Sequence, residues 1–261
     1  MPLAAVQQIT GENAMAEKNI TIQRLFLILT ALAAVSGCAT TQPPPRFQFP
    51  AGTRVGIVNQ LEPYATHQNF SEARIRNFTK TVNVDWDIPG NMQEELTQGL
   101  QHDPRYKVIP ITGENPIPIV IDRVSGPGAV VPQAAAALES VAGKYNVNVI
   151  IIIKSFKGPT RLKLDKHGFI LQGYGLFTRQ FLFFNRAFAY ANLAVIVFKT
   201  GPLTYIGSGE PTIDTDPLED FKLSGDLKII PPSEINKLEP IIKKYAHQAV
   251  VKALHTANLI Q

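Results

Sequence analysis

The sequence predicts a mixed α/β (α+β) fold in which helices pack on a mixed sheet. Residues 147–153 (VNVIIII) are apolar on both faces, which is typical of a central strand that pairs in parallel with a neighbour. An alanine-rich segment of helical character directly precedes this strand. Residues 169–209 alternate apolar and polar side chains, as antiparallel strands do. The predicted order of elements is β-β-α-β-α-β-β-β-β-α.

Two strands, a helix and a third strand are predicted in the first half of the folded region. The two strands are residues 54–61 (RVGIVNQL) and 78–84. Apolar side chains then recur at helical spacing through 91–101. The third strand, 106–112 (YKVIPIT), contains Pro110, which cannot donate a ladder hydrogen bond and therefore predicts a sheet edge or a strand end.

A proline-rich loop follows these elements. Residues 113–132 contain several prolines and glycines, and a loop of this length and stiffness is expected to carry contacts. The loop leads into a helix predicted at 133–145. The central strand at 147–153 comes after only a short break.

Four more elements complete the order: strands at 169–184, 187–199 and 203–209, and a helix at 233–259. The first two strands are expected to form a hairpin that turns at Asn185 and Arg186. The third strand should pair with this hairpin in the antiparallel direction. The final helix has an apolar face opposite a row of lysines and contains Pro240.

The amino-terminal region carries a short apolar run that ends on the chain's single cysteine. The run is residues 25–38 (LFLILTALAAVSGC), and the basic residues Lys18 and Arg24 come before it, as in a signal peptide. The run is too short to span a bilayer as a permanent helix. Its last residues, VSGC at 35–38, resemble the lipobox of bacterial lipoproteins. In that motif the cysteine thiol, here Cys38, receives a diacylglycerol, a peptidase cuts just before it, and the new amino terminus is acylated. The alternative is an ordinary secretory signal with an incidental cysteine.

This interpretation divides the chain into three parts. Residues 1–37 form a signal peptide, in which Met15 gives the better-proportioned start and 1–14 are attributed to a mis-assigned start codon. Residues 38–53 are the lipidated cysteine and a proline-rich tether in an extended conformation. Residues 54–261 are predicted to be a single periplasmic α/β domain.

Lipidation at Cys38 implies that the mature protein is held at a membrane. One acyl chain binds a bilayer only marginally, whereas the two or three chains of a mature lipoprotein form a stable anchor. Ala39 follows the cysteine, where the inner-membrane retention signal of enterobacterial lipoproteins has Asp. We therefore expect a lipid anchor in the outer membrane, with the protein facing the periplasm. Once lipidated, the single cysteine is unavailable for a disulfide.

The charge pattern gives no indication of a nucleic-acid partner. The net charge is +4, and the predicted signal peptide carries as many acidic as basic residues, so its removal leaves that charge unchanged. The basic residues are spread along the chain, without the clusters that neutralise phosphates. We therefore expect contacts with the membrane through the lipid and with other envelope proteins or further copies of this chain.

The sequence offers few candidates for catalysis. The five histidines are scattered, and there is no Gly-x-Ser-x-Gly elbow, P-loop, dinucleotide fingerprint or known calcium loop. We therefore predict no catalytic residue, no metal site and no cofactor, and we classify the protein as a non-enzyme. The candidates for an unrecognised hydrolase site are Asp85, Asp87 and His167.

Several segments of the sequence, taken in order, resemble a known family. They are RVGIV at 54–58, the helix-to-strand segment NMQEELTQGLQHDPRYKVIPI at 91–111, the helix-to-strand segment AAAALESVAGKYNVNVIIII at 134–153, the hairpin and the final helix. This order is similar to the periplasmic domain of the curli-secretion lipoprotein family and to the related TolB amino-terminal domain, over most of residues 54–260. The resemblance implies a binding and assembly module. The curli-secretion protein also contributes two membrane-spanning hairpins per subunit to an oligomeric export pore, whereas this chain offers at most one long hairpin.

The predicted hairpin is rich in aromatic side chains. Phe181, Phe183, Phe184 and Tyr190 are the candidate partner contacts, because an apolar cluster of this kind at a surface turn needs a cover. A partner subunit is the simplest cover. The alternative is that residues 169–199 cross a membrane, for which each strand needs about 9 to 11 alternating residues.

We therefore expect a structural or assembly component of a multi-protein envelope complex, such as a secretion or surface-appendage system. The proline-rich loop, the aromatic hairpin and the last helix are the expected contact surfaces. One alternative is a subunit of an oligomeric outer-membrane pore similar to the curli exporter. A second alternative is an envelope hydrolase with an unrecognised site.

Overall fold

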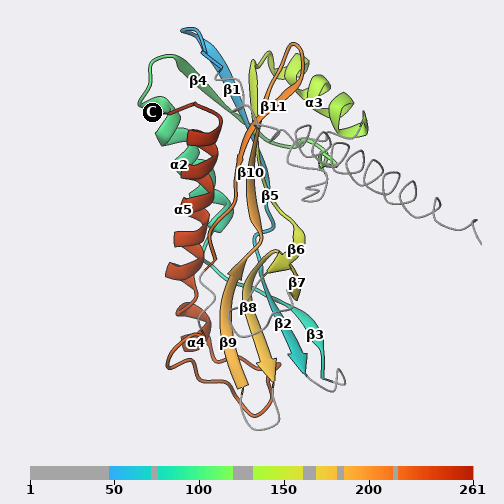
Figure 1. Cartoon of the computed structure of the whole chain (residues 1–261), viewed down its shortest axis with the longest axis vertical. Coiled ribbons are helices and arrows are strands. Elements are labelled where there is room, and N and C mark those ends of the chain that lie inside the picture. Colours follow the sequence, from blue (N-terminus) through green and yellow to red (C-terminus); the bar gives the residue numbers. More distant parts are fainter. Residues whose placement is uncertain are drawn as a thin grey trace, which may run out of the picture. The chain divides into compact units, whose positions relative to one another are not determined.

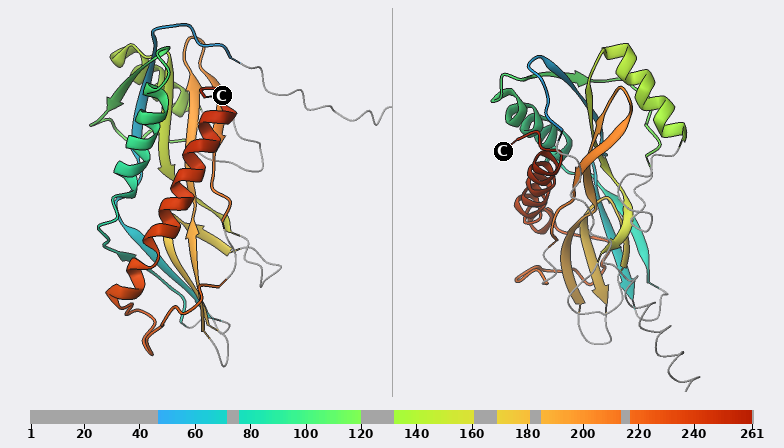
Figure 2. Two further views of the ribbon diagram at one scale, coloured as in Figure 1. Left: turned by 90° about the vertical axis from the view of Figure 1, so that its left-hand side faces the viewer. Right: turned by 45° about the horizontal axis from the view of Figure 1, so that its top comes forward.

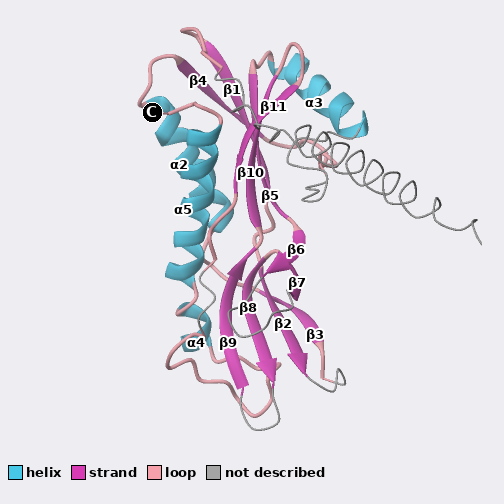
Figure 3. Cartoon of the chain, viewed as in Figure 1, coloured by secondary structure: helices cyan, strands magenta, loops and turns pink. Residues whose placement is uncertain are grey.

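The computed structural model describes residues 47–71, 76–119, 132–160, 169–180, 185–213 and 217–260 (Figure 1). They lie in one compact unit, Pro45–Gln261. Helices and strands are mixed along this unit and the strands form three sheets, which confirms the predicted α/β class (Figure 3). Cys38 and the rest of the predicted signal lie outside the described residues.

The largest sheet has five strands in the order β11-β10-β5-β1-β4. These strands are β1 (Thr53–Gln60), β4 (Tyr106–Ile111), β5 (Val149–Ser155), β10 (Leu193–Lys199) and β11 (Thr204–Gly209). β1 pairs in parallel with β4 and β5, whereas β10 pairs antiparallel with β5 and β11. β5 is thus the central strand of a mixed sheet, as predicted. Pro110 lies on β4, an edge strand, which is also as predicted.

A second sheet of four strands and a small two-stranded sheet complete the β structure. The four-stranded sheet contains β2 (Ala65–Ser71), β3 (Phe78–Val82), β8 (Tyr174–Gln180) and β9 (Asn185–Ala191), in the order β3-β2-β8-β9. The two-stranded sheet pairs β6 (Lys157–Thr160) with β7 (Phe169–Gln172). The single sheet that the sequence predicted is therefore divided, because the chain leaves one sheet and joins another at Gly173 and Asn192.

Helices cover both faces of the five-stranded sheet. They are α2 (Ile88–Gln101), α3 (Pro132–Tyr145), the short α4 (Pro232–Asn236) and α5 (Glu239–Thr256). One buried cluster joins α2 and α5 to the sheet, and a second joins α3 to the opposite face. Ile151 belongs to the first cluster and its neighbour Ile152 to the second. A strand buried on both sides must be apolar at every position, which explains the isoleucine run of β5.

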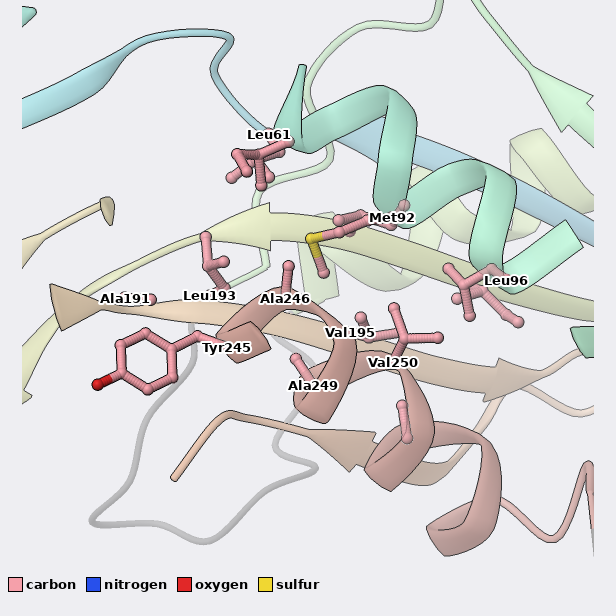
Figure 4. Close-up of a cluster of buried hydrophobic side chains, with 14 of the residues drawn as sticks. Leu61, Met92, Leu96, Ala191, Leu193, Val195, Tyr245, Ala246, Ala249 and Val250 are labelled. Atoms are coloured by element: carbon pink, nitrogen blue, oxygen red, sulfur yellow. The ribbon is translucent and has the colours of Figure 1, made fainter. Parts of the chain in front are cut away.

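The main cluster lies between the two long helices and the sheet. Met92 and Leu96 of α2 meet Ala246 and Val250 of α5 above Val195 of β10 (Figure 4). α5 continues along β9, so that one helix covers part of both larger sheets (Figure 2). This shared cover joins the two sheets in one hydrophobic core.

The strands β8 and β9 are covered on both faces. Leu176, Ala187 and Ala189 belong to the main cluster on one face. On the other face, a separate aromatic cluster consists of Phe169, Leu171, Phe177, Phe188 and Tyr190, with Phe70 packed against it. The aromatic alternation that the sequence shows within the described part of this hairpin therefore corresponds to intramolecular burial.

Two local predictions about the chain are wrong, and one strand was missed. Asn185 and Arg186 belong to β9, where they pair with Gln180 and Arg179 of β8, and so they do not form the hairpin turn. The predicted last helix is two helices, since Pro240 occupies the first turn of α5, where its missing N–H is not needed. Strand β2 was not predicted at all, because its sequence, ATHQNFS, is polar.

Candidate functional site

A crevice lies at the carboxyl edge of the parallel strands β1, β4 and β5. After β1 the chain turns towards the α2 and α5 side, where Leu61 is buried, whereas after β4 it turns towards the α3 side, where Ile117 is buried. Adjacent strands whose loops diverge in this way leave an opening, which is the usual ligand position in open α/β sheets. The opening has a volume of about 720 Å³.

Two polar side chains from neighbouring strands form the floor of the crevice. Gln60 and Lys154 are register partners, at the ends of β1 and β5. They continue the rows of Val58 and Ile152, which face α3 in the apolar core. The sheet thus changes from apolar to polar at the edge where the crevice begins.

Lys154 holds the loop that forms one wall. Its Nζ donates a hydrogen bond of 2.7 Å to the carbonyl oxygen of Ile119. Burial lowers the pKa of the Lys154 ammonium group, and the nearby Glu62 carboxylate opposes this effect only in part. Burial therefore destabilises the charged form of Lys154.

Glu62 is held in position by a side chain and a backbone contact. Ser155 Oγ donates a hydrogen bond of 2.6 Å to Glu62 Oε2, and the Tyr174 hydroxyl donates one of 2.9 Å to the Glu62 carbonyl. Burial is the main cause that raises the Tyr174 pKa, so this hydroxyl keeps its proton and remains a donor. Glu62 is thereby fixed at the mouth of the crevice.

The opposite wall is the described part of the proline-rich loop, residues 114–119, which the sequence analysis expected to carry contacts. Glu114 accepts hydrogen bonds from Lys144 Nζ at 2.6 Å and from the Tyr145 hydroxyl at 2.8 Å. These two donors, Lys144 first, lower the pKa of the Glu114 carboxyl. The loop is thus tied to the end of α3.

One amide at the floor has an unused donor. Gln60 Nε2 is buried and has no hydrogen-bond partner, whereas the Asn59 amide next to it donates to the Pro89 carbonyl at 2.8 Å. A buried donor without a partner costs about 1–3 kcal/mol, so it is rarely kept without a reason. Together with the ammonium groups of Lys154 and Lys157, the lining supplies donors suited to an acceptor or anionic ligand.

The sequence analysis did not identify Lys154 or Gln60. A cation immediately after the apolar run of β5 was the available signal, because ligands of parallel sheets gather at carboxyl ends. Gln60 carried no signal, since its pairing with Lys154 exists only in the folded chain.

The candidate partner contacts differ in their outcome. Phe181, Phe183 and Phe184 lie outside the described residues. Tyr190 is fully buried, and its hydroxyl accepts a 2.6 Å hydrogen bond from Gln68 Nε2 and donates one of 2.9 Å to the Gln172 carbonyl. Tyr190 is therefore an interior residue, and its prediction as a surface contact is wrong.

The residues considered for hydrolysis have separate outcomes. Asp87 is the N-cap of α2, where its side chain accepts a hydrogen bond from the Gly90 N–H. Asp85 is exposed, and His167 lies outside the described residues. Among the residues that the structure describes, no group of three or more His, Cys, Asp or Glu side chains could hold a metal ion.

A second polar cluster is enclosed within the four-stranded sheet. Thr178 Oγ1 donates to Asn69 Oδ1 at 2.8 Å, so that His67 Nε2, 2.9 Å from the same hydroxyl, is the donor to it. Asn69 donates in turn to the Arg76 carbonyl at 2.8 Å. Burial, with a contribution from Lys80, lowers the pKa of His67 to about 4. This neutral imidazole joins β2 to β8.

No helix in the described part of the chain is long and apolar enough to cross a membrane. Comparisons of the chain with protein-family models, with curated proteins and with solved structures find no significant match.

Proposed function

We propose that this protein is a lipid-anchored structural or assembly component of a multi-protein complex in the bacterial envelope, of the secretion or surface-appendage type. The single observation that carries the proposal is the lipobox-like end at Cys38, located a short distance before the folded unit. The anchor places the protein on the periplasmic side of the outer membrane.

The start of the folded unit is fixed at one end of the sheet. Phe49 is buried and packs edge-on against Tyr106, with 6.2 Å between ring centroids. The Phe47 carbonyl accepts a hydrogen bond of 3.2 Å from Asn258 near the carboxyl terminus. Between Cys38 and Phe47 the extended chain reaches at most about 30 Å.

The crevice lies at the other end of β1. The strand runs from Thr53 to Gln60 at the floor of the crevice, which is a rise of about 23 Å. A ligand site at this edge of the sheet suits contact with other envelope proteins and supports a binding module.

The described part of the aromatic hairpin gives no support to the pore alternative. Phe177 and Phe188 are fully buried in the aromatic cluster, and Ala187 and Ala189 are buried against the main core on the other face. A membrane-spanning hairpin needs an apolar face that is free to contact lipid. In β8 and β9 the chain itself covers both faces.

Co-purification tests this function. The full-length protein with a carboxyl-terminal tag is expressed in its native envelope, extracted in mild detergent and captured, and the bound proteins are identified by mass spectrometry. We expect a set of envelope proteins in fixed ratio, and loss of that set for Cys38→Ser. A homo-oligomer alone favours the pore alternative, and a lone monomer contradicts both functions.

A further inference from the structure

The crevice contains a cation that forms no ion pair with any described residue. Among the ion pairs between described residues, none includes Lys154 or Lys157. The hydrogen-bond partner of Lys154 among the described residues is neutral, the Ile119 carbonyl, although the Lys154 side chain is half-buried. A partly buried ammonium group is stabilised strongly by an anion, because attraction between charges increases where water is excluded.

The carboxylates of the lining are already engaged elsewhere. Glu114 is bonded by Lys144 and Tyr145 of α3, and Glu62 accepts the Ser155 hydroxyl. The lining carries two positive side chains, Lys154 and Lys157, and two negative ones, Glu62 and Glu114, and Lys144 adds a positive charge beside Glu114. Glu62 acts on Lys154 without forming an ion pair with it, and burial remains the larger influence on the Lys154 pKa. An incoming anion has no strong competitor at Lys154.

The shape and surface of the crevice suit a peptide. A volume of about 720 Å³ falls within the range of about 300–1,000 Å³ that is typical of sites for drug-sized ligands. Pro116 and Pro118 on one wall and Phe156 on the other provide apolar surface beside the charged group. The buried Gln60 amide offers a further donor if the floor adjusts to a ligand.

We propose that this crevice binds a carboxylate of a peptide segment from a partner protein, with the Lys154 ammonium group as its principal contact. The inference rests on the proposed function, because it specifies how the binding module recognises its partner. Lys157 and the Gln60 amide are secondary donors, and the prolines contact the peptide's apolar atoms.

A pair of matched peptides tests the inference. The mature chain carrying Cys38→Ser is titrated with N-acetyl-trialanine, which ends in a carboxylate, and with its carboxyl-terminal amide, and binding is followed by NMR. We expect saturable shifts around β5 and residues 114–119 with the acid, and roughly tenfold weaker binding of the amide. Equal binding of both peptides, or binding of neither, overturns the inference. Tighter binding of inorganic phosphate than of the acid overturns it as well.

Variants of Lys154 locate the contact. Lys154→Met should weaken binding of the acid roughly tenfold, whereas Lys154→Arg should retain it within about threefold. Lys80→Met is the matched control, because Lys80 also donates to one backbone carbonyl, that of Lys228, but lies in the other sheet. Unchanged binding by Lys154→Met contradicts the inference. If Lys154→Met does not fold, the acid and amide comparison on the unmodified chain still decides.

Failure of the peptide-binding inference can be distinguished from failure of the proposed function. Lipid attachment at Cys38 does not depend on which peptide binds the crevice. A lipidated protein that assembles normally with Lys154→Met in place retains its proposed function and loses this inference. A protein that binds the acid but carries no lipid retains this inference and loses the proposed function.

Discussion

The Gln68 amide donates a 2.6 Å hydrogen bond to the hydroxyl of Tyr190, and this contact links β2 to β9 across the intervening strand β8. Both side chains are buried, and the Tyr190 hydroxyl also donates to the Gln172 carbonyl next to the crevice. A polar strand becomes an interior strand through such contacts, because buried polar groups are tolerated when they are hydrogen-bonded.

Tyr190→Phe should therefore destabilise the protein by about 2 kcal/mol, since it removes a buried hydroxyl and leaves the Gln68 amide with one weak partner. Chemical denaturation measures the change. Tyr205→Phe is the control, because the Tyr205 hydroxyl contacts Ser208 at 2.8 Å in a half-buried position. We expect less than about 1 kcal/mol for the control, and equal effects contradict the assigned role of Tyr190.

His67 should make the stability depend on pH. Its pKa is lowered from 6.5 to about 4 in the folded protein. Between these two pH values, His67 binds a proton in the unfolded chain and remains neutral in the folded chain. Stability from this residue is complete above pH 6.5 and is lost as the pH falls towards 4, by about 3 kcal/mol in all. Denaturation of the wild type and His67→Gln across this range measures the difference.

Lys80 allows a second test of the pH dependence assigned to His67. Its charge contributes to the lowered pKa of His67, after burial. Lys80→Met should therefore reduce the loss of stability between pH 6.5 and 4, without abolishing it. Identical pH profiles for the wild type and His67→Gln would mean that His67 is not the group responsible.

Gly175 should tolerate no side chain. Its φ is 141°, and an added Cβ would lie 2.4 Å from the Thr66 carbonyl oxygen of the paired strand β2. Gly175→Ala should thus cost more than about 2 kcal/mol of stability, measured by thermal denaturation. Gly143→Ala is the matched control, because Gly143 lies in α3 with open space around it. That change should stabilise the protein by about 0.5–1 kcal/mol.

Asp87 should act as a helix cap and not as a catalyst. Asp87→Ala removes the acceptor of the Gly90 N–H and should cost about 1 kcal/mol of stability. Asp85→Ala, at an exposed position two residues earlier, should leave stability unchanged within about 0.5 kcal/mol. Loss of a measured hydrolytic activity in either variant, without loss of folding, would contradict this assignment and favour the hydrolase alternative.

The fold class followed from local patterns that determine burial. The isoleucine run of β5 had to be covered on both faces, and the apolar rows of α2 and α5 required a sheet beneath them. The edge position of β4 followed from Pro110, which cannot join a ladder. Each of these conclusions needs only one segment and its periodicity.

The division into sheets and the crevice depended on distant pairings. The polar side chains of β2 bond to distant residues, Gln68 to Tyr190 and His67 to Thr178. These partners lie more than a hundred residues away, so no local pattern reveals them. Gln60 and Lys154 become neighbours only when β1 and β5 pair. The composition of the proline-rich loop predicted that it carries contacts, whereas its position beside Lys154 required the fold.

The most direct test of the account is the mass of the amino-terminal peptide of the protein purified from bacterial membranes. We predict a chain that begins at Cys38 and carries a diacylglyceryl group on the thiol and an acyl chain on the new amino terminus. A mature chain that begins at another residue, or that retains an unmodified Cys38 thiol, would contradict the lipid anchor on which the proposed function rests.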